Sequence, residues 1–183
     1  MTGLYRCFDA ANPPDSTPPG CAAALGYVGA PGRAYHIWTT AEWHAHPGTQ
    51  QFPAWVPNLA NHPVNEAGDI LTAMHQAGWT PGHLFAAVID YETTGFAAAG
   101  WHSALTQSLG RFNVDGIAYG SESTVVQTEA AHLWVAKWDG VQELDPAGQT
   151  VHGHQYAANV PYGGTVVDYS VVDTWLMSRG LRR

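Results

Sequence analysis

The sequence predicts an α/β fold in which helices pack around a mostly parallel sheet. Segments with the two-residue period of strands alternate with segments of helical period through the first two thirds of the chain, as expected for βα units. The apolar run Leu84–Glu92 fits a strand that is covered by helices. A chain of 183 residues is short for a full eight-stranded barrel, so a closed barrel must be compact and must lack some helices late in the chain.

Eight segments have the composition and period of strands, and loops rich in proline and glycine separate them. The final third of the chain consists mostly of such segments, so helices are expected mainly in the first two thirds. The expected strands are Leu4–Phe8, Ala23–Gly29, Phe52–Val56, Leu84–Glu92, Gly116–Tyr119, His132–Trp138, His152–Ala157 and Thr165–Tyr169.

Three segments have the pattern of helices. Thr39 followed by Glu42 is a capping-box pattern, so a short helix is expected to begin near Thr40. Two longer helices are expected where apolar residues recur at helical spacing before a glycine, at Asn65–Ala77 and Trp101–Leu109. No internal repeat divides the chain, so residues 1–183 are expected to form a single domain.

The composition excludes several classes of function. Seven lysine and arginine residues against fifteen aspartate and glutamate residues give a net charge of −8, which argues against a nucleic-acid partner. No apolar run is long enough to span a membrane. Neither a phosphate-binding G-x-x-x-x-G-K-[ST] loop nor a G-x-S-x-G nucleophile motif is present, and no cofactor is expected. The two cysteines, Cys7 and Cys21, either pair or remain free, partly buried thiols.

Ten histidines raise the question of a metal site. His44 with His46, and His152 with His154, would each place two imidazoles on one face of an extended strand. Catalytic zinc takes three protein ligands and a water, however, and neither H-E-x-x-H nor C-x-x-C occurs. His44 and His46 lie beside a Pro-Gly pair and are expected in a solvated loop. No metal site is therefore predicted.

Two carboxylates stand at the end of the most apolar expected strand. Side chains alternate along a strand, so Asp90 and Glu92 are expected on one face, with Cα atoms roughly 6.6–7 Å apart, and Tyr91 on the face toward the helices. Such a pair can reach one glycosidic bond, and barrel enzymes keep their chemistry at the carboxyl ends of strands. The other interpretation is that these acids mark a strand leaving the core.

Asp9 and Asp168 each stand at the end of an expected strand in the same way. In a barrel the first and last strands are neighbours, so these two acids would meet at one rim, although each could also form a turn or a cap. Packing several carboxylates together raises the pKa of at least one of them, as a general acid requires. Tyr119 and Trp134 are expected to line the same rim and to contact a sugar, with ordinary core packing as the alternative.

Seven short motifs occur in order along nearly the whole chain: FDAA (Phe8–Ala11), GYVG (Gly26–Gly29), IDYET (Ile89–Thr93), AYGS (Ala118–Ser121), LWVAKW (Leu133–Trp138), HQY (His154–Tyr156) and VVDYSVV (Val166–Val172). Together they resemble the family-25 glycoside hydrolases, the muramidases of bacteria and phages. The resemblance is greater to their relatives in actinobacteria and phages that are described as glycoside-hydrolase-like barrels of uncertain activity. Asp9-Ala10-Ala11 departs from the D-V-S of the family's first strand, and the long insert containing YHIWTTAEW favours these relatives.

The resemblance implies a compact TIM-like (β/α) barrel of about five βα units with three closing strands. It implies hydrolysis of the bond between N-acetylmuramic acid and N-acetylglucosamine in peptidoglycan. Glu92 would be the proton donor, Asp90 would stabilise developing positive charge, and the other two aspartates would hold substrate and tune the pair. The substrate-binding residues expected on this basis are Tyr119, Trp134, Gln155 and Tyr156.

The expected partner is therefore peptidoglycan or a related wall polysaccharide. The alternative is a catalytically weak or inactive barrel that binds wall glycan or serves as a structural module of a phage particle. The start of the chain lacks a signal-peptide pattern, so the protein is expected to remain in its cell, to leave by lysis or another route, or to act in a phage virion.

Overall fold

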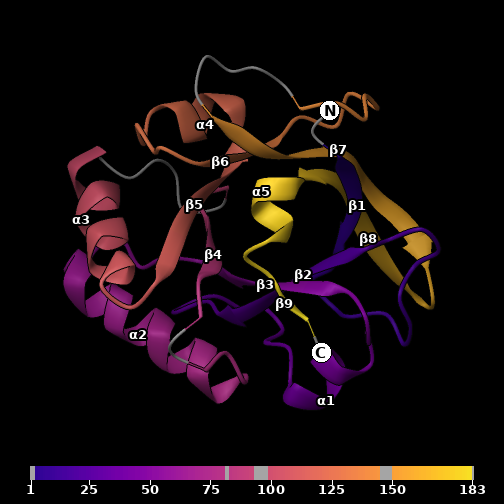
Figure 1. Ribbon diagram of the computed structural model, residues 1–183, viewed down its shortest axis with the longest axis horizontal. Coiled ribbons are helices and arrows are strands. Elements are labelled where there is room, and N and C mark those ends of the chain that lie inside the picture. Colours follow the sequence, from indigo (N-terminus) through magenta and orange to yellow (C-terminus); the bar gives the residue numbers. More distant parts are fainter. Residues whose placement is uncertain (1–2, 81–82, 93–98, 145–149, 183) are drawn as a thin grey trace.

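The computed structural model describes residues 3–80, 83–92, 99–144 and 150–182, in which eight strands close into a barrel (Figure 1). Strands β1 to β7 run parallel to one another, whereas β8 lies antiparallel between β7 and β1. A short ninth strand, β9 (Leu181–Arg182), pairs with β3. The barrel strands are β1 (Leu4–Asp9), β2 (Ala23–Gly29), β3 (Gln50–Trp55), β4 (Phe85–Asp90), β5 (Val114–Ser121), β6 (Leu133–Ala136), β7 (Val151–Tyr162) and β8 (Thr165–Asp173).

Helices follow β2, β3, β4 and β5 in the described part of the chain, so the compact α/β barrel expected from the sequence is confirmed. The predicted capping box is present, because Thr39 and Glu42 exchange side-chain-to-backbone hydrogen bonds. None of the described helices is long and apolar enough to cross a membrane. The helices are α1 (Thr40–His44), α2 (Pro63–Gln76), α3 (Ala99–Gly110), α4 (Glu122–Val126) and α5 (Thr174–Met177).

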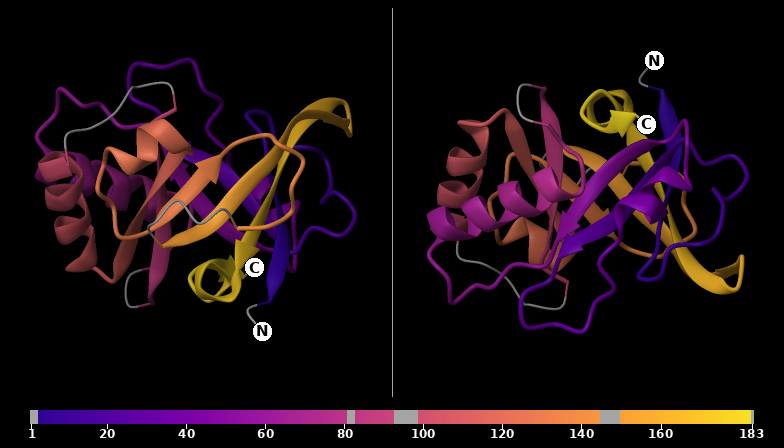
Figure 2. Two further views of the ribbon diagram at one scale, coloured as in Figure 1. Left: turned by 90° about the horizontal axis from the view of Figure 1, so that it is seen from above. Right: turned by 90° about the horizontal axis from the view of Figure 1, so that it is seen from below.

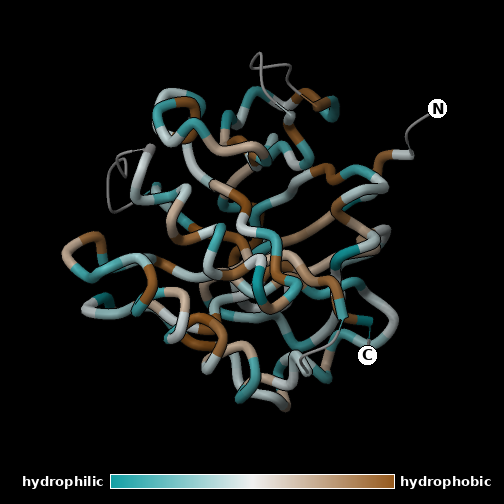
Figure 3. The backbone as a smooth tube through the Cα atoms, turned by 60° about the vertical axis from the view of Figure 1, so that its left-hand side comes forward, coloured by the Kyte–Doolittle hydropathy of each residue, from teal (hydrophilic) through white to brown (hydrophobic). Residues whose placement is uncertain are grey.

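Alternating side chains of the strands build two apolar cores. One core fills the barrel interior and includes Leu25, Val88, Ile117 and Trp134. The other lies between the strands and the surrounding helices. Figure 3 shows apolar segments among the strands at the centre of the molecule. The interior is tight: a Cβ on Gly153 would lie 2.5 Å from the Trp134 ring, so only glycine leaves room for the indole there.

Three strands differ from the sequence prediction near the candidate acids. β4 ends at Asp90, so Glu92 lies beyond the strand and is exposed. β7 and β8 are longer than predicted and form a hairpin that extends from the barrel on the side opposite α2 and α3 (Figure 2). Tyr91 is buried toward α3, as predicted, and its hydroxyl lies 2.7 Å from His102 Nδ1.

The prediction of a solvated loop for His46 is wrong. Its side chain is fully buried, with ring centroids 5.1 Å from Phe8 and 5.5 Å from Trp38. Burial lowers the pKa of His46 and favours the neutral ring. Cys7 and Cys21 are both free thiols.

Candidate active site

Four carboxylates gather at the end of the barrel where the parallel strands finish. Asp9 is the last residue of β1, and Asp90 is the last residue of β4. Asp168 lies directly opposite Asp9 in the ladder between β1 and β8. Because β8 is antiparallel, Asp168 reaches this rim from the first half of its strand, and not from the strand end that the sequence predicted. Glu92 lies just beyond Asp90.

Gln155 of β7 holds Asp9 and Asp168 together. Its Nε2 donates to Asp9 Oδ2 at 2.9 Å and to Asp168 Oδ2 at 3.1 Å. Its Oε1 accepts the indole N–H of Trp138 at 2.6 Å, which fixes the orientation of the amide. Asn159 N donates to the remaining oxygen of Asp168 at 2.6 Å. Gln155 is buried, and in this structure its amide bridges Asp9 and Asp168.

Burial raises the pKa of Asp9 well above its ordinary value, and the neighbouring Asp168 adds to that rise. Burial also raises the pKa of Asp168, although the hydrogen bonds from Asn159 and Gln155 act in the opposite direction. The two facing carboxyls therefore bind a proton more readily than two isolated carboxylates would.

Asp90 is held by two hydrogen-bond donors. The Tyr27 hydroxyl donates to its Oδ2 at 2.7 Å, and Glu92 N donates to its Oδ1 at 2.8 Å. Asp90 is only 1% exposed, and this burial raises its pKa, whereas both donors lower it. With a donor on each oxygen, the side chain is fixed in position and its ionised form is stabilised.

Glu92 has a more open setting than Asp90. Partial desolvation raises the pKa of its carboxyl group, Asp90 and Asp168 raise it further, and a hydrogen bond from Tyr119 opposes the change. The turn that carries Glu92 packs closely on the end of β5, where a Cβ on Gly120 would lie 3.3 Å from Glu92 N. Gly120 also has a φ of 150°, which other residues rarely adopt. Glu92 thus combines a raised pKa with access to solvent.

Of the aromatic residues predicted to bind substrate, Tyr119 lies beside the acids and Trp134 lies beneath it. Tyr119 hydrogen-bonds Glu92, and its ring centroid is 6.2 Å from that of Trp134, edge to face. Trp134 is 0% exposed, and its indole N–H donates to Ser170 Oγ at 3.1 Å. A ligand has no access to Trp134 in this structure, so its role here is to support Tyr119 from inside the barrel.

Tyr156 is not brought to the acids. It follows Gln155 in β7 and therefore points to the other face of the strand, where it belongs to the outer core. Its side chain is 5% exposed. The structure thus separates the two residues of the Gln155-Tyr156 pair, placing the amide at the rim and the phenol behind it.

Two residues at the rim were not selected from the sequence. Tyr27, near the end of β2, holds Asp90 through its hydroxyl. Trp138 lies just beyond β6 with 55% of its surface exposed and its indole N–H on Gln155. A signal for Trp138 was present, because it shares strand parity with Trp134 and lies four positions closer to the strand end.

The fold of this chain is similar to that of several known structures. No protein-family model matches the sequence, and no curated protein matches it either. The structure matches an uncharacterized protein of B. stearothermophilus with a TM-score of 0.72 at 14% identity, over 97% of this chain and 100% of that one.

The matched structures also include lytic enzymes. The CTP1L endolysin matches with a TM-score of 0.68 at 13% identity, over 94% of this chain and 67% of that one. The spore cortex lytic enzyme SleM of Clostridium perfringens matches with a TM-score of 0.66 at 11% identity, over 93% of this chain and 67% of that one. The resemblance that the sequence motifs indicate is confirmed at the level of the fold, a barrel that this chain shares with an endolysin and a spore cortex lytic enzyme.

Proposed function

We propose that this protein is a glycoside hydrolase that cleaves the glycan strands of peptidoglycan, as a muramidase does, by carboxylate acid/base chemistry. The observation that carries the proposal is the unlike setting of Asp90 and Glu92 at one rim. Asp90 is buried and accepts two hydrogen bonds, whereas Glu92 is exposed and has a raised pKa. Carboxyl groups in unlike surroundings are the usual means of glycosidic bond cleavage. The shared fold with lytic enzymes supports a wall polymer as substrate.

In the proposed mechanism Glu92 protonates the oxygen of the leaving sugar, and Asp90 faces the positive charge that develops on the sugar ring. A water molecule then bonds to the ring carbon that has lost its leaving oxygen, and the proton that it releases restores the acid form of Glu92. Tyr27 keeps Asp90 in place through its hydroxyl. Asp9 and Asp168, bridged by Gln155, hold the substrate and add negative potential to the same rim. The charge of Asp168 also raises the pKa of Glu92 and so favours the acid form of Glu92 at working pH.

The test is digestion of purified, insoluble peptidoglycan, followed by analysis of the ends that are created. The turbidity of the suspension is expected to fall while new reducing sugar ends accumulate. Release of new amino groups without reducing ends would show cleavage of the peptide and would contradict the proposal. Binding of the protein to peptidoglycan with no new ends would instead support the alternative of a barrel that binds wall glycan.

Trp138 is expected to contribute to substrate binding by stacking on a sugar ring, because its indole is exposed beside the acids and is anchored on Gln155. Replacing Trp138→Ala should raise KM about 10-fold, and Trp138→Phe should raise it less, because a ring face remains. Steady-state kinetics on soluble glycan fragments would measure both values. An unchanged KM in Trp138→Ala would contradict the stacking role.

Activity is expected to survive treatment with EDTA. In the part of the chain that the structure describes, no group of three or more His, Cys, Asp or Glu side chains is arranged to hold a metal ion. The proposed chemistry uses carboxyl groups alone, so removing divalent ions should leave the rate of digestion unchanged. Loss of activity on chelation, with recovery on adding zinc, would overturn this prediction.

A further inference from the structure

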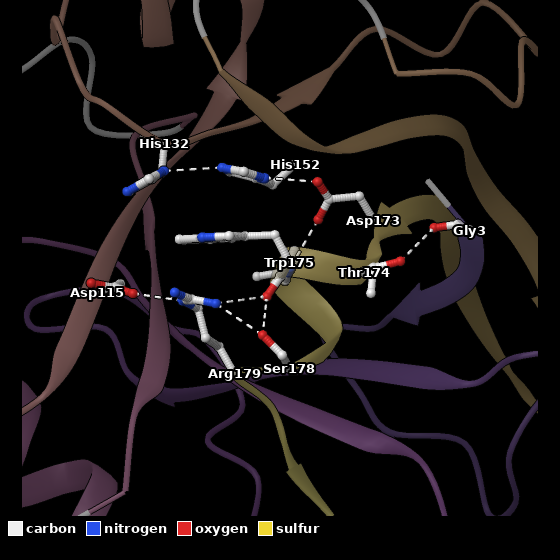
Figure 4. A network of polar contacts seen from close by, with 10 residues as sticks. Gly3, Asp115, His132, His152, Asp173, Thr174, Trp175, Ser178 and Arg179 are labelled. Carbon is white, nitrogen blue, oxygen red and sulfur yellow. Dashed lines mark hydrogen bonds and ion pairs between the residues drawn. The ribbon is translucent and has the colours of Figure 1, made fainter. Parts of the chain in front are cut away.

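A chain of polar contacts links several elements at the end of the barrel opposite the carboxylates (Figure 4). His132 Nδ1, just before β6, lies 3.0 Å from His152 Nε2 near the start of β7. His152 Nδ1 lies 2.9 Å from Asp173 Oδ2 at the end of β8. The other oxygen of Asp173 accepts Leu176 N at 2.8 Å and so caps α5. One carboxylate therefore joins the two imidazoles to the start of α5.

Trp175 of α5 packs on the same imidazoles. Its ring centroid lies 4.3 Å from that of His132 and 3.9 Å from that of His152, and both pairs are stacked. Arg179 Cζ lies 3.8 Å from the Trp175 ring, on the side away from the imidazoles in Figure 4. Arg179 Nε donates to Asp115 Oδ2 of β5 at 2.7 Å. The stack thus connects α5 to β5 as well as to β7.

The helix held by these contacts covers one end of the barrel. In Figure 1, α5 lies in the middle of the ring of strands. Leu176 of α5 is fully buried and belongs to the interior core. The chain before α5 is held in β8, and the chain after it is held by the pairing of β9 with β3. Release of the histidine contacts would leave α5 and the residues after it held by the burial of Leu176, by the Arg179–Asp115 ion pair and by the pairing of β9.

The contact between the two histidines limits how many protons they can carry. A hydrogen bond between ring nitrogens needs a proton on one nitrogen and a lone pair on the other. His152 Nδ1 is committed to the Asp173 carboxylate. The pair can accept one extra proton, on the open side of His132, and keep the bond. When both rings are charged, no lone pair remains and the bond is lost.

The groups that face the pair from other elements set its charge balance. Burial lowers the pKa of His132, and His152 and Arg179 lower it further. Asp115 and Asp173 act in the opposite direction. In the unfolded chain these neighbours are absent and both rings take up protons near the ordinary histidine value of about 6.5. The unfolded state therefore binds more protons than the folded state below that value.

We propose that His132 and His152 form a proton-sensitive latch that holds α5 against the end of the barrel and releases it when both rings become charged. The latch is closed at neutral pH and is weakened as the pH falls below the ordinary histidine value. The stability that it supplies is present above the ordinary histidine pKa and declines as the pH falls below it, because unfolding then takes up a proton.

The first test compares thermal unfolding between pH 5 and pH 8 for the wild type and for His132→Asn. An asparagine amide sits where Nδ1 was and can bond His152 without titrating. The variant takes up one proton fewer than the wild type on unfolding. Its melting temperature should therefore fall less steeply with acid than that of the wild type, by about 3–5 °C per pH unit. The control His75→Gln removes an exposed histidine outside the network and should keep the wild-type dependence. A wild-type dependence in His132→Asn would overturn the latch.

The second test is hydrogen exchange of the wild type at pH 5 and pH 7.5, corrected for the chemical exchange rate. Protection of residues 174–182, which include α5 and β9, is expected to fall about 10-fold per pH unit below pH 6.5. The parallel strands should keep their protection over the same range. Equal loss of protection throughout the molecule, or none in α5, would contradict the proposal even if His132→Asn failed to fold.

Discussion

Replacing Glu92→Gln is expected to lower kcat on peptidoglycan by about 10²–10⁴-fold, because the amide keeps the shape of the side chain but has no acidic proton. Binding of peptidoglycan should remain, since the Gln155 bridge between Asp9 and Asp168 is untouched. A substrate with an activated aryl leaving group departs without protonation, so the variant should recover most of the wild-type rate on it. Rates on both substrates would be measured by the release of reducing ends and of the aryl group.

The matched control for this variant is Glu129→Gln, which makes the same change at an exposed position away from the four acids. The control should digest peptidoglycan at the wild-type rate. Two outcomes would contradict the role of Glu92 as general acid. One is digestion of peptidoglycan by Glu92→Gln as fast as by the wild type, and the other is an equal loss of rate on the activated substrate.

Replacing Asp90→Asn is expected to lower kcat by about 10²–10³-fold on both kinds of substrate, because the positive charge on the sugar ring loses its facing carboxylate whatever the leaving group. The amide also cannot accept on its nitrogen, so either Tyr27 or Glu92 N loses its present acceptor. The pattern that identifies Asp90 is therefore a loss that the activated substrate does not rescue.

Asp69→Asn, an exposed aspartate of α2, is the control for this second variant and should remain fully active. Tyr27→Phe separates the charge of Asp90 from its positioning, because it leaves the carboxylate but removes one donor. It should reduce kcat less than Asp90→Asn does. Rescue of Asp90→Asn by the activated substrate would show that Asp90, and not Glu92, supplies the proton.

The sequence was sufficient to predict the meeting of Asp9 and Asp168, because the first and last strands of a barrel are neighbours and both residues stand near the same rim. It was also sufficient for β2, whose predicted and observed bounds coincide. The apolar period predicts which face a side chain occupies, and this explains why Tyr91 was correctly assigned to the helix side.

The two-residue period of a strand does not predict how deep along the barrel axis a side chain lies. Trp134 and Trp138 share parity, but β6 spans only Leu133–Ala136, so the first is sealed inside and the second is exposed at the rim. Short elements such as α5 and β9 span too few residues for a period to emerge. The bridge from Gln155 to two acids depends on partners 146 and 13 residues away, which no local pattern records.

The hydrogen bonds around the Gln155 amide leave Asp9 and Asp168 with different numbers of free carboxyl oxygens. Gln155 Oε1 accepts the indole N–H of Trp138, so Gln155 Nε2 is the atom that faces the two carboxyl groups. Each of these groups must therefore turn an unprotonated oxygen toward Nε2. Asp168 uses its second oxygen on Asn159 N, so three of the four oxygens have a donor. Among the described residues, Asp9 Oδ1 is the one left for a proton to occupy. Any proton that this pair stores is therefore expected on Asp9, because Trp138 orients the Gln155 amide and Asn159 N occupies the second oxygen of Asp168.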